Sequence, residues 1–94
     1  MIIERQTTTA SVENEFIFQV KAQDFTVKNF TEGNIFVSDV TPVIKEKAIM
    51  IPPQAGQDIT MGKTNTANAT AVDTLYVLPE ATSQIGVEIQ AIRW

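Results

Sequence analysis

Large apolar residues alternate with polar ones along several short stretches of this chain, which is the two-residue period of a β-strand. The clearest stretch is 15–21, where Phe16, Phe18 and Val20 share one side of the strand. No segment has the length and the 3.6-residue period of an ordinary helix. Strands of this kind are predicted at 15–21, 24–30, 35–38, 48–51, 58–61, 75–78 and 85–90.

Turn-forming residues separate these strands. Gly33 and Asn34 both accept positive φ angles, so the sequence predicts a β-hairpin closed at 31–34. Helix formers compete with a strand over 44–51, but the prolines that flank this stretch favour a short strand that ends at Pro52. The stretch 62–74 has hardly any large apolar residue and is predicted to be an exposed loop.

About six or seven short strands with a turn every 8 to 12 residues are typical of an all-β protein, either a small antiparallel β-sandwich or a jelly-roll-like domain. The chain of 94 residues is long enough for a single domain, predicted at 14–94 and preceded by a mobile arm at 1–13. Whether the sheet closes into a barrel is left open. The predicted core is Phe16, Phe18, Val20, Phe25, Val27, Ile35, Val37, Ile49, Ile51, Ile59, Leu75, Val77, Ile85, Val87 and Ile89.

The chain contains neither cysteine nor histidine. This composition removes disulfides, cysteine nucleophiles, histidine bases and the commonest ligands of zinc and iron. The carboxylates are dispersed along the sequence, and no calcium-loop pattern occurs. We therefore expect a protein that is not an enzyme and that needs no cofactor.

A net charge of −4 without a basic cluster disfavours binding to nucleic acid. The first residues lack the basic and apolar regions of a signal peptide, and no apolar run approaches the roughly 20 residues of a membrane helix. The sequence thus predicts a protein made in the cytoplasm, with no membrane partner.

Apolar residues at both ends of so short a chain suggest contacts between copies, because a small domain cannot bury them all. The predicted interface between copies consists of Ile2, Ile3, Arg93 and Trp94, the last two being residue types that interfaces favour. A second hypothesis is that Phe36 and Tyr76, together with the loop 62–74, contact a carbohydrate or another small ligand.

Four segments resemble small β-sandwich proteins encoded in the structural modules of tailed bacteriophages and prophages. The segments are the stretch from Phe25 to Ser38, the stretch from Ile49 to Gly56 with its Ile-Pro-Pro-Gln-Ala-Gly turn, Leu75-Tyr-Val77 and Val87-Glu-Ile89. Together they span about residues 24 to 91, and the first 13 residues match no part of the pattern.

The resemblance implies a virion component without enzymatic activity, such as a head-decoration, head-fibre or tail-accessory protein. Such a protein forms homo-oligomers and contacts capsid or tail proteins in the virion. The alternative is a carbohydrate- or small-ligand-binding β-sandwich module.

Overall fold

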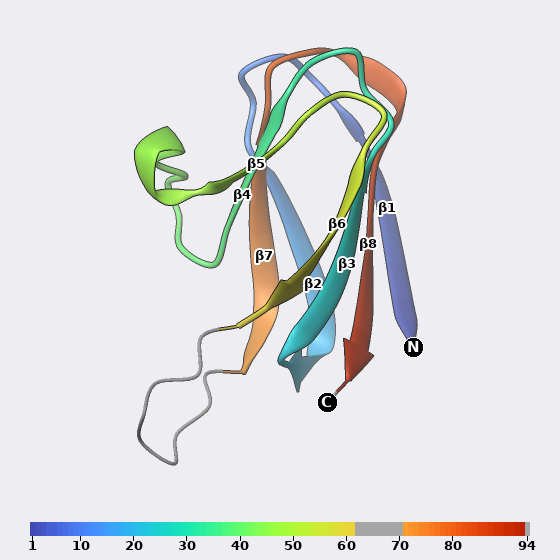
Figure 1. The fold of residues 1–94 in the computed structure, drawn as a ribbon, viewed down its shortest axis with the longest axis vertical. Helices are drawn as coiled ribbons and strands as arrows, with labels where there is room; N and C mark the ends of the chain where they lie inside the picture. The colour runs from blue at the N-terminus through green and yellow to red at the C-terminus, as the bar shows by residue number, and fades with distance from the viewer. Residues whose placement is uncertain (62–70, 94) are drawn as a thin grey trace.

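A computed structural model describes residues 1–61 and 71–93 of the chain. These residues form two four-stranded antiparallel sheets packed face to face (Figure 1). One 3₁₀ turn, η1 (Lys45–Lys47), interrupts the strands. The strands are β1 (Ile2–Thr8), β2 (Asn14–Ala22), β3 (Asp24–Asn29), β4 (Ile35–Ser38), β5 (Ile49–Ile51), β6 (Gly56–Thr60), β7 (Val72–Pro79) and β8 (Ser83–Arg93).

The strand order is that of a jelly roll. One sheet, called sheet A, has the order β1-β8-β3-β6, and the other, sheet B, has the order β2-β7-β4-β5. The first strand pairs with the last, the second with the seventh, the third with the sixth and the fourth with the fifth. A single long hairpin wound around a barrel-like core gives this arrangement, so the predicted all-β sandwich or jelly-roll-like class is confirmed.

The core lies between the two sheets and consists mainly of the inward-facing residues predicted from the alternation. Phe18 and Phe25 bring their rings to 5.3 Å between centroids across the sheets. Val20 and Ile49 are partly buried against this core. Its buried members are Phe16, Phe18, Ala22, Phe25, Val27, Ile35, Val37, Ile51, Ile59, Leu75, Val77, Val87, Ile89 and Ala91.

Ile85 is the predicted core residue that the structure places elsewhere, with 62% of its surface exposed. The cause is a kink at Gly86, which has a φ of 75°. A Cβ at this position would lie 1.9 Å from the backbone oxygen of Gln6, so only glycine fits there. The kink interrupts the alternation between Ile85 and Val87 and turns Ile85 outward.

The hairpin predicted at 31–34 is wrong, because β3 belongs to sheet A and β4 to sheet B. The segment between them crosses from one sheet to the other. The Nδ2 of buried Asn29 donates hydrogen bonds to the carbonyl oxygens of Gly33, Ile51 and Pro52, and its Oδ1 accepts one from the backbone N–H of Thr31. A buried asparagine therefore holds this crossing, and positive φ angles at Gly33 and Asn34 are not used.

Two further boundaries differ from the predictions. Residues 1–13 do not form an arm apart from the domain, because β1 pairs with β8 and adds an eighth strand to the seven predicted ones. Of the predicted loop 62–74, residues 62–70 lie outside the described residues, whereas Val72–Thr74 belong to β7. The strand predicted before Pro52 is confirmed as β5, and the competing helix appears only as the single turn η1.

Candidate functional site

An exposed apolar corner lies on the outer face of sheet A, where the first and last strands meet. Ile3 on β1 is directly opposite Gln90 on β8, so Ile3 and Ile92 are diagonal neighbours on the same face. Their exposed fractions are 52% and 44%, and that of Met1 beside them is 70%. In Figure 1 both chain ends lie at this end of the sandwich. We call Met1, Ile3 and Ile92 the terminal corner.

The terminal corner contains only part of the interface predicted from the sequence. Ile3 is exposed as expected, but Ile2 faces inward and packs against the core. The backbone of Arg93 pairs with Asp24 at the end of β8. Trp94 lies outside the described residues. Ile2 and Ile3 face opposite sides because neighbouring residues of a strand alternate. Sequence reasoning did not include Ile92 in the interface, because the pairing of β8 with β1 cannot be read from the sequence.

The two predicted ligand contacts share the outer face of sheet B but do not form an open platform. Phe36 is directly opposite Leu78 on β7, so Tyr76 is its diagonal neighbour. The Nζ of Lys45 lies 5.1 Å from the centroid of the Phe36 ring, and Phe36 is only 8% exposed. The loop between β4 and β5 thus covers Phe36, and the contact of Phe36 and Tyr76 with a ligand stays a prediction.

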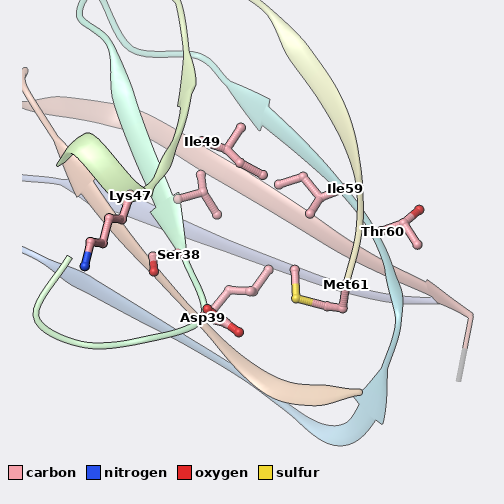
Figure 2. A pocket seen from close by; sticks show the side chains of 9 residues that line it. Ser38, Asp39, Lys47, Ile49, Ile59, Thr60 and Met61 are labelled. Atoms are coloured by element: carbon pink, nitrogen blue, oxygen red, sulfur yellow. The ribbon is translucent and has the colours of Figure 1, made fainter. Parts of the chain in front are cut away.

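A pocket of about 230 Å³ opens between the sheets beside β6. In Figure 2 Ile49 and Ile59 point toward each other across this pocket, and Met61 reaches in from the end of β6. Five of its lining residues are apolar and four are polar. The lining residues are Val37, Ser38, Asp39, Lys47, Ile49, Ile59, Thr60, Met61 and Leu75.

The outer face of sheet A also carries a cluster of polar side chains around Glu88, which is only 6% exposed. The Nε of Arg5 donates a hydrogen bond of 3.1 Å to Oε1 of Glu88, and the Nη2 of Arg5 donates to the same oxygen. The Nε2 of Gln90 donates to the other oxygen at 2.8 Å. The hydrogen bonds from Arg5 and then from Gln90 lower the pKa of Glu88 from its ordinary value of 4.5, although partial burial opposes them.

This cluster stabilises the carboxylate form of Glu88 and joins β1 to β8. Because the pKa of Glu88 is lowered, its carboxyl group is not suited to act as an acid or a base near neutral pH. Sequence reasoning missed it because Arg5 and Glu88 are 83 positions apart and become neighbours only through the pairing of the first and last strands. Among residues 1–61 and 71–93, no group of three carboxylates lies close enough together to hold a metal ion. The same residues include no helix long and apolar enough to span a membrane.

No family model, curated protein or solved structure matches this chain. The fold therefore defines the class of the protein, a small jelly-roll β-sandwich, and its function is inferred from its surfaces.

Proposed function

We propose that this protein is a structural subunit without enzymatic activity that assembles with copies of itself, and that it serves as a component of a bacteriophage virion. The observation that carries the self-assembly is the terminal corner, where Met1, Ile3 and Ile92 expose 70%, 52% and 44% of their surfaces. Apolar residues gathered at one place on a small domain are typical of an interaction surface. The jelly-roll topology supports the virion role, because viral capsid domains use it, and so does the resemblance of residues 24 to 91 to phage structural proteins.

The experiment that tests the assembly is light scattering across a dilution series. We expect a mass above the 10.4 kDa of a single chain at high concentration. The double substitution Ile3→Ser and Ile92→Ser should shift the protein to the monomer, because it removes the apolar surface that two copies would bury together. Deletion of the first residues would be a poor test, since it removes β1 from sheet A.

Ile85→Ser is the matched control. Ile85 is 62% exposed on the same strand as Ile92 but at its other end, so its replacement should leave the assembly unchanged. A wild-type chain that is monomeric at every concentration, or a control that dissociates as readily as the double variant, contradicts the proposal. The virion role is tested separately, by mass spectrometry of purified particles from the replicon that carries the gene.

A second candidate function, the binding of a small ligand, is favoured by the pocket beside β6. A lining of apolar residues with a few polar groups is the usual form of a small-molecule site. Thermal-shift measurements with monosaccharides and small apolar acids and amines test this function. The substitution Met61→Arg in the pocket lining should abolish any stabilisation by a ligand, whereas Met50→Arg on the exposed face of β5 should not.

A further inference from the structure

The two edges of sheet A are suited to join each other in successive copies. β1 and β6 lie at opposite ends of the order β1-β8-β3-β6, and within the described residues each pairs with one neighbour only. Every neighbouring pair is antiparallel, so β1 and β3 run in one direction and β8 and β6 in the other. A β6 strand placed beside β1 of another copy would therefore continue the antiparallel sheet.

The edges of sheet B are poorer places for an added strand. β5 has only three residues and is followed at once by Pro52 and Pro53, which cannot donate backbone hydrogen bonds. β2 carries a register shift between Ile17 and Ala22, with Gln19 at a φ of 63°. A short edge, prolines and a bulge are features that oppose edge-to-edge pairing. β1 has its own register shift between Gln6 and Thr8, and Asn14 donates a hydrogen bond to the carbonyl oxygen of Thr7. Among the described residues, the edges suited to an added strand are therefore β6 and the first part of β1.

The charges on the outer face of sheet A favour contact between unlike edges. Arg5 on β1 has a side chain that is 63% exposed, and Asp58 on β6 is exposed on the same face. Two β1 strands side by side would bring two Arg5 side chains to one face of the ribbon, and two β6 strands would bring two Asp58 side chains there. Like charges opposite each other destabilise strand pairing, and opposite charges stabilise it.

The inward side of the contact offers a place for an apolar residue. The pocket beside β6 is lined by residues of β6 and of the β4–β5 pair (Figure 2). β6 and β5 are edge strands of their two sheets. Strand addition commonly combines backbone hydrogen bonds along an edge with a pocket for alternate side chains. On β1 the inward-facing apolar residue is Ile2, which packs only partly against its own core.

We propose that β1 of one copy pairs with β6 of the next, with Ile2 opposite Ile59 at the pocket and Arg5 opposite Gly56. In this register Glu4 lies opposite Gln57, whose amide can donate to a carboxylate, and Arg5 is the diagonal neighbour of Asp58. The inference rests on the proposed self-assembly and adds a contact through strand edges beside Ile3 of the terminal corner, whereas Ile92 on β8 lies outside this contact. Because the two surfaces differ, the contact is heterologous and extends into a ring or a filament.

Engineered cysteines test this pairing directly, since the chain has no cysteine of its own. Arg5→Cys and Gly56→Cys are made as separate variants, mixed and oxidised. The two sites face outward on opposite edges of one sheet, and a Cβ at Gly56 meets nothing closer than 3.4 Å. We expect the mixture to form a disulfide-linked dimer several-fold more than either variant alone, because a disulfide needs Cα atoms within about 7 Å.

Lys28→Cys is the matched control, because Lys28 is exposed on the same face but on the inner strand β3. It should cross-link weakly with Arg5→Cys. Strong cross-linking of Arg5→Cys with itself overturns the proposal in favour of a symmetric β1 pair. If Arg5→Cys cross-links with Lys28→Cys as much as with Gly56→Cys, β1 does not select the β6 edge and the proposal is wrong. A wild-type oligomer without the 5 to 56 cross-link overturns this pairing alone, whereas a wild-type monomer overturns the proposed function as well.

Discussion

The two sheets bury a common core between them but differ on their outer faces. The outer face of sheet A is largely polar and is joined by side-chain contacts such as those of Glu88 with Arg5 and Gln90. The outer face of sheet B carries Phe36, which is 8% exposed because the loop between β4 and β5 lies over it. A domain of this size has a limited core, so covering one outer face with a loop adds a second apolar layer.

Hydrogen bonds and charges hold this covering loop in place. The carboxylate of Glu13 accepts a hydrogen bond from Thr41 Oγ1 through one oxygen and another of 2.7 Å from the backbone N–H of Val43 through the other. Val43 itself is 9% exposed. The Nζ of Lys45 lies 3.6 Å from a carboxylate oxygen of Glu80. In Figure 1 the loop and η1 lie on the side of sheet B that faces away from sheet A.

The largest effect is expected for Phe36→Ala, which removes the main side chain of the second apolar layer. Replacement of a buried phenylalanine by alanine typically lowers the free energy of unfolding by about 3 kcal/mol or more. Denaturation in urea measures this loss. Met50→Ala is the control, because Met50 is directly opposite Phe36 on β5 yet 51% exposed, and its loss should stay below about 1 kcal/mol. Equal losses for the two variants would show that the loop does not bury Phe36.

A smaller effect is expected for Glu13→Ala, which releases the loop but leaves the sheets intact. The backbone N–H of Val43 loses its acceptor, and a lost hydrogen bond to a charged group costs about 1 to 3 kcal/mol. Limited proteolysis should show faster cleavage within residues 39–48, where the loop is held by these contacts. Glu15→Ala on the exposed side of β2 is the control and should leave the cleavage rate unchanged. Unchanged cleavage in Glu13→Ala would mean that other contacts hold the loop.

The inner faces were predictable from the sequence and the outer faces were not. Alternation places Ile35 and Val37 inward, because core residues between two sheets follow the two-residue period wherever the strand is regular. It also places Phe36 on the outward side, between the inward Ile35 and Val37, but it does not show that Phe36 is buried there. What buries Phe36 is the loop that directly follows β4, and a two-residue period carries no information about how such a loop folds back over its strand.

The connection predicted between β3 and β4 was wrong for a similar reason. Gly33 and Asn34 are residues typical of a hairpin turn, yet the hydrogen bonds of Asn29 direct the chain to the other sheet. Only glycine fits at position 86, because a Cβ there would collide with the backbone of Gln6 on β1. β1 is remote from Gly86 in the sequence, so this collision could not be predicted. Of the candidate interface, Ile3 was predictable from its position at the chain end, whereas its neighbour Ile92 depends on the pairing of β1 with β8.

An acid-dependent loss of stability is expected on the outer face of sheet A. The pKa of Glu88 is lowered in the folded chain, so its stabilising contribution is complete above the ordinary value of 4.5. That contribution is lost as the pH falls below 4.5 and through the folded-state pKa. The free energy of unfolding of the wild type should therefore fall more steeply with acid than that of Glu88→Gln, by an amount on the order of 1 kcal/mol.

Urea denaturation at several pH values from neutral to strongly acidic measures this difference. Parallel curves for wild type and Glu88→Gln would show that Arg5 does not stabilise the carboxylate of Glu88.

The smallest effect is expected for Thr26→Val on the same outer face. The hydroxyl of Thr26 donates a hydrogen bond of 2.7 Å to Oδ1 of Asp58, but this contact is exposed, so water replaces it at little cost. The change in the free energy of unfolding should stay within about 0.5 kcal/mol. A larger loss, measured by urea denaturation, would mean that β6 depends on this contact. A small loss would mean that the fold does not depend on the bond between Thr26 and Asp58, as the proposed β1 to β6 contact requires.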